Sequence, residues 1–167
     1  MKYIISYDLG TGGTKASLFN ENGISVVSVF VPCDTFYPKN GFHEQRPEDW
    51  WNNVVVSTKE MLSKIKVEVE DIVSLAVSGH SLGVVPIGYD GELLAEYVPI
   101  WSDSRAGEQA RKFFESVEEE QWYLTTGNGF PAGLYSIFKL MWYKHHSIDM
   151  YEKTDKFIGT KDYINYC

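Results

Sequence analysis

Hydrophobic and polar residues along the first thirty positions follow the pattern of β-strands. Residues 3–7 and 24–31 are rich in apolar and β-branched side chains, and residues 14–19 alternate apolar with polar. Two breaks separate these runs: the glycine-rich segment 8–13, and residues 20–23, whose Asn-Gly pair tolerates the positive φ of a tight hairpin. The pattern predicts an antiparallel meander of three strands.

The middle of the chain predicts a helix followed by two strands. After a polar loop, Pro47 suits the first turn of a helix, and apolar residues recur at helical spacing through residues 47–66. The expected buried face consists of Trp51, Val55, Thr58, Leu62 and Ile65. Residues 72–78 are nearly all apolar, which predicts a strand buried on both faces, and residues 84–87 predict a fifth strand.

Helical patterns dominate the last third of the chain. We expect helices near residues 104–115, 118–124 and 133–146. The apolar face of the last helix consists of Leu134, Ile137, Phe138, Met141 and Trp142. Three strands, a helix and a further strand exclude an all-α bundle. They favour an α/β fold with a mixed sheet, led by a three-stranded antiparallel meander and flanked by helices.

Composition and charge narrow the class of protein. The chain has 167 residues, enough for one domain, and its 44% hydrophobic and 23% charged residues exclude disorder for most of it. A net charge of −8 without a basic run argues against binding to nucleic acid or to an anionic membrane. Two cysteines fit a reducing compartment, and no apolar run has the length of a secretion signal or membrane span. We therefore expect a soluble, cytoplasmic protein.

The glycine-rich segment 8–15 (DLGTGGTK) is a candidate phosphate site. Three of the four residues 10–13 are glycine, so backbone N–H groups can approach an anion closely. Asp8 stands at a strand end, where a carboxylate can hold hydrated Mg²⁺. The spacing around Lys15 does not fit a Walker loop, and the strand that follows does not fit a dinucleotide fingerprint. A tight hairpin without a ligand is the alternative.

Residues 79–83 (GHSLG) match the GxSxG pattern of serine hydrolases. In those enzymes the serine, here Ser81, stands on a sharp turn from a strand into a helix. The following segment contains Pro86 among β-branched residues, which resist a helix. A serine hydrolase is therefore the second interpretation of this chain, and a simple bend between two strands is the third.

Residues 101–105 (WSDSR) could form one side of a polyol pocket. Trp101 would supply a stacking face, Asp103 an acceptor and Arg105 a fork of donors. A helix N-cap at Asp103 or Ser104, with the tryptophan in the core, explains the same residues without a ligand.

Taken together, these segments resemble the N-terminal half of the FGGY carbohydrate kinases, especially the xylulokinase-like branch. Segments 8–15, 44–51 and 101–105 are similar to the family's DxGTxxxK, EQxPxxWW and WxDxR motifs, and segment 78–83 lies where xylulokinases carry GQMHG. Residues 126–128, 139–142 and 161–163 are similar to its TGN, KLxW and KDY motifs. The match is colinear over nearly the whole chain.

The resemblance implies a ribonuclease H-like domain of the actin and hexokinase type, and transfer of the γ-phosphate of ATP to a hydroxyl of a small-molecule sugar. Asp8 would orient Mg²⁺ through water. The residues that would face the phosphates of ATP are Gly10, Thr11, Gly12, Gly13, Thr14 and Lys15. The residues that would border the sugar are His80, Ser81, Leu82, Trp101, Asp103 and Arg105.

Two departures from the family qualify this expectation. Where xylulokinases place Gln, Met and His, this chain has His80, Ser81 and Leu82, so another ketose, a polyol or a sugar acid is open as substrate. Family members also have a second domain, which supplies the adenosine site and the catalytic base. We expect residues 1–167 to be the N-terminal domain alone, inactive by itself and with an apolar face that promotes homo-oligomers. A sugar-binding remnant without catalysis is a further alternative.

Overall fold

The computed structural model describes residues 1–129 and 131–167, and these form two compact units. The first unit comprises residues 1–35, 45–81 and 160–167. The second unit comprises residues 36–44 and 82–159. The chain thus passes from the first unit to the second and back again twice. The first unit consists of three segments of the sequence and the second unit of two.

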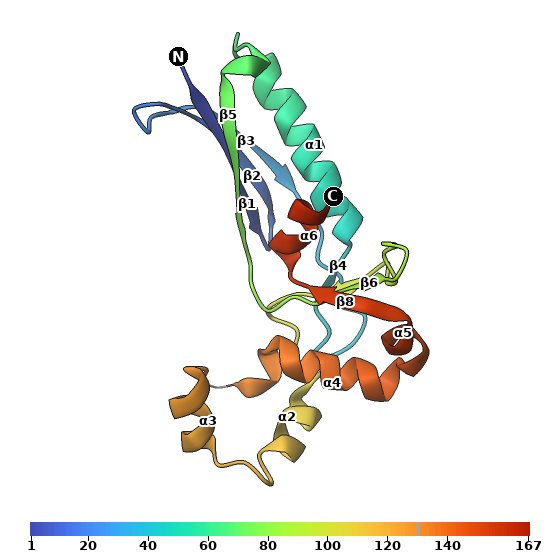
Figure 1. Ribbon diagram of the computed structural model, residues 1–167. Helices are drawn as coiled ribbons and strands as arrows, with labels where there is room; N and C mark the ends of the chain where they lie inside the picture. Colours follow the sequence, from blue (N-terminus) through green and yellow to red (C-terminus); the bar gives the residue numbers. More distant parts are fainter. Residues whose placement is uncertain (130) are drawn as a thin grey trace. The chain divides into compact units, whose positions relative to one another are not determined.

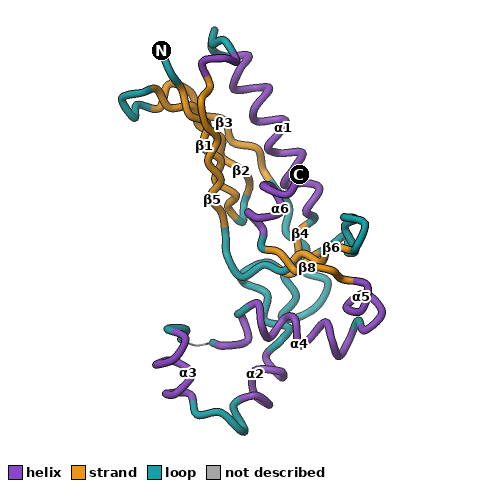
Figure 2. Tube along the Cα trace, in the orientation of Figure 1, coloured by secondary structure: helices purple, strands orange, loops and turns teal. Residues whose placement is uncertain are grey.

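The first unit is built on a mixed sheet of four strands (Figures 1 and 2). Its strands are β1 (Tyr3–Gly10), β2 (Gly13–Asn20), β3 (Ser25–Pro32) and β5 (Ile72–Gly79), in the order β3-β2-β1-β5. The first three pair antiparallel and β5 runs parallel to β1. The predicted meander and the predicted mixed α/β sheet are confirmed.

Helix α1 (Pro47–Ser63) packs against β2 and β3 and begins with proline in its first turn, as predicted. The predicted buried face of this helix is wrong by one residue. After Pro47, the buried positions are Trp50, Asn53, Val54, Ser57 and Met61, whereas Trp51 is 37% exposed. The error arises because two neighbouring faces of the helix carry apolar residues, one including Trp50 and the other Trp51. Trp50 is the buried one, and its indole N–H donates to a buried acceptor, Gln45 Oε1.

Strand β5 is not buried on both faces, contrary to the prediction. Val73 and Leu75 are 57% and 63% exposed. The reason is that β5 is an edge strand and α1 lies mainly over β2 and β3. The short helix α6 (Thr160–Tyr166) packs against β5. A groove of about 500 Å³ follows between α1, β1 and β5.

The second unit combines short strands with helices. Strands β6 (Val85–Gly88) and β8 (Thr154–Ile158) pair antiparallel, and β4 (Glu44–Gln45) pairs with β7 (Val98–Pro99). The remaining elements of the chain are α2 (Gly107–Phe113), α3 (Glu119–Thr126), α4 (Ser136–His146), α5 (Ile148–Lys153) and the 3₁₀ turns η1 (Val69–Asp71) and η2 (Ala132–Leu134). The three predicted helices exist with somewhat different bounds. The strands β4, β7 and β8 and the helices α5 and α6 were not predicted.

The core of the helical part centres on Phe138 of α4. It packs with three buried alanines, Ala106, Ala110 and Ala132, and with aromatic rings of α2 and α3. The predicted face of α4 is only partly right, because Ile137 is exposed and Lys139 is fully buried. Among the helices of the described part of the chain, none is long and apolar enough to cross a membrane.

Candidate functional site

The turn between β1 and β2 presents charged side chains and glycines at one end of the sheet. Asp8 pairs in register with Lys15 across the two strands, and Gly10 pairs with Gly13. The Asp8 and Lys15 side chains are both exposed, as are Gly10 and Gly12. A carboxylate, an ammonium group and accessible backbone therefore stand together, which fits the predicted phosphate segment.

Glycine is required at one position of this turn. Gly13 has a φ of +151°, and a Cβ there would overlap the Val31 carbonyl and the Phe30 ring and approach Pro32 Cα to 2.8 Å. At Gly12 a Cβ would meet nothing within 4 Å. The turn is thus packed tightly against β3 on one side and open on the other.

The bend after β5 lies beside the end of β1. Leu9 O accepts a hydrogen bond of 3.0 Å from His80 N, and a Cβ at Gly79 would come within 2.9 Å of Leu9 Cβ. The His80 ring packs edge-to-face on Trp50, and its Nδ1 lies 3.2 Å from Thr160 Oγ1. The first unit therefore brings Asp8, the glycine turn and His80 to the carboxyl ends of two parallel strands, where open α/β sheets bind ligands.

The geometry around Ser81 does not form a nucleophile elbow. The exposed serine is followed by a bend and then by strand β6, whereas the elbow of a serine hydrolase leads directly into a helix. Leu82 has a φ of +63°, a left-handed conformation that is uncommon for a residue other than glycine. The segment is therefore a strained bend between two strands.

Asp103 and Arg105 form a buried ion pair in the second unit. Asp103 is fully buried, and its carboxylate accepts from His43 N at 2.8 Å, from Arg105 N at 3.1 Å and from the Arg105 guanidinium at 2.7–3.0 Å. Glu44 accepts a further bond of 2.6 Å from the guanidinium. Helix α2 begins at Gly107 with Ala106 as its N-cap, so the alternative of a cap at Asp103 or Ser104 is wrong.

Aromatic rings enclose the guanidinium of Arg105. It lies 4.0 Å from the centroid of Phe42 and 4.9 Å from that of Trp142, and the side chain is 4% exposed. Burial opposes the charge, but the hydrogen bonds and charges of Asp103 and Glu44 outweigh it and raise the pKa of Arg105. With their polar groups bonded to the protein, Asp103 and Arg105 are placed to hold the 101–105 loop. Their contact with a sugar stays a prediction.

Lys139 fastens two segments that carry predicted sugar-binding residues. Its side chain is fully buried, and its Nζ donates to Leu82 O at 3.0 Å and to Ile100 O at 2.7 Å. Ile100 precedes Trp101, whose side chain is 42% exposed and can offer its ring to a ligand. Burial lowers the pKa of Lys139 to about 8, with Asp103 and Arg105 acting in opposite directions.

Two residues now visible in supporting roles were not among the predicted site residues. Lys139 interrupts the apolar pattern of its helix, a signal that could have marked it as buried with a partner. Gln45 is also fully buried, and its amide bonds the Thr11 carbonyl of the β1–β2 turn at 2.7 Å. Its place just before α1 gave no comparable signal, because the Thr11 carbonyl that it bonds lies 34 residues away in the sequence.

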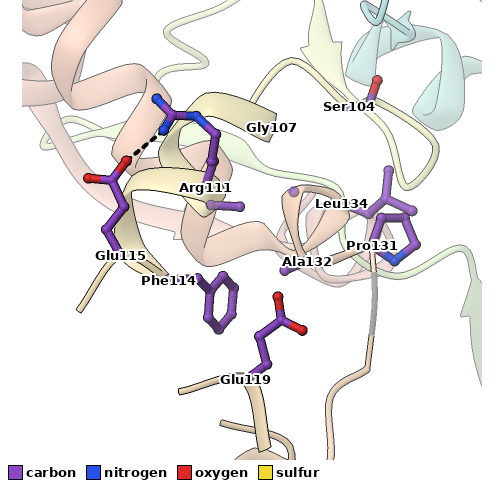
Figure 3. A pocket seen from close by; sticks show the side chains of 11 residues that line it. Ser104, Gly107, Arg111, Phe114, Glu115, Glu119, Pro131, Ala132 and Leu134 are labelled. Atoms are coloured by element: carbon purple, nitrogen blue, oxygen red, sulfur yellow. Dashed lines mark hydrogen bonds and ion pairs between the residues drawn. The ribbon is translucent and has the colours of Figure 1, made fainter. Parts of the chain in front are cut away.

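The second unit also contains an apolar pocket of about 570 Å³, between α2, η2 and the start of α3 (Figure 3). Phe114 and Ala132 lie in its wall, which also includes the ion pair between Arg111 of α2 and Glu115, two residues after the end of that helix. None of the predicted site residues lines this pocket. Its mainly apolar wall does not supply the convergent polar groups that a sugar needs.

The described residues form no metal site made of side chains alone. Within residues 1–129 and 131–167, no three His, Cys, Asp or Glu side chains group closely enough to bind a metal ion. A single exposed carboxylate such as Asp8 fits a hydrated Mg²⁺, since this ion keeps most of its waters and takes few protein ligands.

Comparisons with known proteins agree on one family. The N-terminal domain model of the FGGY family of carbohydrate kinases matches residues 3–167. Xylulose kinases from Staphylococcus xylosus and Bacillus subtilis are 31% and 29% identical over 99% of this chain. The crystal structure of ligand-bound xylulose kinase from Lactobacillus acidophilus superimposes with a TM-score of 0.89 at 29% identity, again over 99% of the chain.

The chain spans about a third of the length of these relatives: 33% of the Bacillus protein, 34% of the Staphylococcus protein and 33% of the Lactobacillus structure. The fold of that third is ribonuclease H-like, as expected from the motifs. The chain belongs to the FGGY family of carbohydrate kinases.

Proposed function

We propose that this chain is the N-terminal part of an ATP-dependent carbohydrate kinase. The reaction transfers the γ-phosphate of ATP to a hydroxyl of a ketose such as xylulose, or of a related polyol or sugar acid. The observation that carries the proposal is the β1–β2 turn, where exposed Asp8 and Lys15 flank accessible glycine backbone in a chain of this family.

The turn is suited to bind the phosphates of ATP. The exposed backbone around Gly10 and Gly12 and the Lys15 ammonium supply positive ends for an anion, whereas Gly13 and Thr14 of the predicted segment are buried in β2. Asp8 would hold Mg²⁺ through water, and the ion would neutralise charge on the phosphate oxygens. Because phosphoryl transfer depends mainly on positioning and charge neutralisation, these groups are the kind that the reaction needs.

The sugar is bordered, in this proposal, by the 79–83 bend and the 101–105 loop. The half-exposed ring of Trp101 offers a stacking face, and Lys139 keeps its loop in place through the Ile100 carbonyl. Leu82 cannot donate a hydrogen bond from its side chain, unlike the histidine of xylulokinases. The identity of the sugar therefore depends on what His80 and Ser81 can reach.

We assign no residue of this chain as the catalytic base. Asp103 is among the residues proposed to border the sugar, but its oxygens already accept hydrogen bonds from the His43 backbone N–H and from Arg105. Such a buried, ion-paired carboxylate is poorly suited to take the hydroxyl proton as its oxygen attacks the γ-phosphorus. We infer that the 167-residue chain alone binds ligands and produces little or no ADP.

Two measurements on the isolated chain test the proposal. Saturation-transfer NMR with D-xylulose, glycerol and D-gluconate should detect binding of at least one compound, and Trp101→Ala should abolish it. A coupled assay for ADP with the same compounds should stay at its blank rate. The matched control is Trp51→Ala, which removes a partly exposed tryptophan of α1 and should leave sugar binding unchanged.

Each outcome discriminates among the alternatives. Binding of none of the compounds, or binding that Trp101→Ala leaves intact, would contradict the assigned sugar site. Ordinary kinase turnover by the chain would contradict the assignment of the base to another part of the protein. Sugar binding that is unaffected by ATP and Mg²⁺, together with no ATP binding at all, would indicate a remnant that has lost catalysis.

A further inference from the structure

Gln45 is a fully buried amide whose orientation is fixed by its partners. Its Oε1 accepts from Trp50 Nε1 at 2.8 Å, and its Nε2 donates to Thr11 O at 2.7 Å and to Thr35 Oγ1 at 2.8 Å. An indole N–H can only donate, so the oxygen of the amide must face Trp50. The NH₂ group must then face Thr11.

This contact determines the direction of a peptide group in the β1–β2 turn. A trans peptide is planar, with its C=O and N–H pointing in opposite directions. Because Gln45 holds the Thr11 carbonyl, the N–H of Gly12 in the same peptide points away from Gln45. Gly12 is exposed and has no side chain, so a ligand can approach that N–H closely.

The same group of side chains extends to the bend after β5. Trp50 is almost completely buried and packs edge-to-face on His80, with ring centroids 5.7 Å apart and planes at 76°. It packs similarly on Tyr163 of α6, at 6.3 Å. Gln45 and Trp50, which are bonded to each other, thus connect the glycine turn to His80: Gln45 contacts the turn and Trp50 contacts the His80 ring. All these residues belong to the first unit.

We propose that Gln45 is a positioning residue for phosphate binding: its amide holds the Thr11 carbonyl so that the Gly12 N–H is aimed at the terminal phosphates of ATP. The Thr11 carbonyl can only accept, so it keeps the NH₂ group on its side of the amide, and the Trp50 N–H meets the oxygen on the other side. This inference rests on the proposed function, since it assigns a task to a residue that supports the phosphate turn without touching the nucleotide.

The test uses two variants that separate the hold on Thr11 from general packing. Gln45→Met keeps the approximate volume and removes all three hydrogen bonds of the amide. Trp50→Phe removes the indole N–H and keeps an aromatic ring, while the bond from Gln45 to Thr11 survives. Ile5→Val, a change in the core of β1 away from the turn, controls for lost stability.

The primary readout needs no ligand. The residual dipolar coupling of the Gly12 N–H in a ¹⁵N-labelled chain reports the orientation of the Thr11–Gly12 peptide. It should agree with the structure in the wild type, Trp50→Phe and Ile5→Val, and deviate in Gln45→Met alone. An unchanged coupling in Gln45→Met, or an equal deviation in all three variants, would overturn the assignment of Gln45.

The second readout is the affinity for MgATP, followed by the amide shifts of residues 10–15. Gln45→Met should weaken binding about tenfold, which corresponds to about 1.4 kcal/mol, and the two controls should stay within about twofold. Equal affinity in all four proteins would overturn the proposed role. If the wild type itself did not bind MgATP, the proposed function would fail, and the dipolar couplings would still decide whether Gln45 orients the turn.

Discussion

Replacing Lys139 by methionine should change how the stability of the chain depends on pH. The Lys139 ammonium is buried and has two backbone carbonyls as partners. A neutral amine has two N–H donors, so it can keep both bonds after losing its proton. Burial lowers the pKa from 10.5 to about 8, and Lys139 therefore loses its proton in the folded chain well before it does so in the unfolded chain.

The sign and size of the effect follow from linkage. Between pH 8 and pH 10.5 the unfolded chain binds more protons at this site than the folded chain, so the free energy of unfolding rises with pH. For these two pKa values the rise from pH 7 to pH 9 is roughly 1 kcal/mol. Burial raises the pKa of Cys33 to about 11, which acts in the opposite direction, but equally in wild type and variant.

The assay is urea unfolding of wild type, Lys139→Met and Lys144→Met at pH 7 and pH 9. Lys144 lies on the same helix and is exposed, so its variant should follow the wild type. Lys139→Met should lack the rise, so its change in unfolding free energy between the two pH values should differ from that of the wild type by roughly 1 kcal/mol. Parallel changes in all three proteins would show that Lys139 keeps its ordinary pKa and would refute the reasoning.

Three further predictions concern the turn and the buried ion pair. Gly13→Ala should destabilise the chain by roughly 3 kcal/mol, because the added Cβ overlaps the backbone of β3, whereas Gly12→Ala should cost less than about 1 kcal/mol; equal urea midpoints for both variants would contradict the described turn. Arg105→Met leaves a buried carboxylate unpaired and should cost roughly 3–5 kcal/mol in the same measurement, and a loss below about 1 kcal/mol would mean that the ion pair is open to water. Asp8→Asn should leave stability within about 0.5 kcal/mol and weaken binding of MgATP by calorimetry about tenfold, with little effect on ATP without Mg²⁺; equal loss with and without the metal would argue against a role in holding Mg²⁺.

Local patterns were sufficient to predict the frame of the first unit. The meander, the glycine turn and the start of α1 at Pro47 depend on neighbouring residues, so their signals lie within short segments. The buried face of α1 and the exposure of β5 depend on which element packs where. When two faces of one helix are apolar, the sequence alone does not show which face is buried. The apolar sequence of a strand likewise does not show whether the strand lies at the edge of its sheet.

The predicted site residues follow the same division. The phosphate segment could be identified because its glycines and Asp8 are contiguous. The partners of the supporting residues could not be predicted, since Gln45 bonds a residue 34 positions away and Lys139 bonds one 57 positions away. Asp103 was predicted to touch the sugar or cap a helix. Its observed partner His43 lies 60 residues earlier in the chain, a separation that no motif encodes.

The most direct test of the phosphate assignment is a titration of the ¹⁵N-labelled chain with MgATP, followed residue by residue. The account predicts that the largest amide shifts fall on residues 10–14, with smaller shifts in the 79–83 bend. No saturable shift at the glycine turn, or shifts concentrated around the apolar pocket beside Phe114, would contradict it.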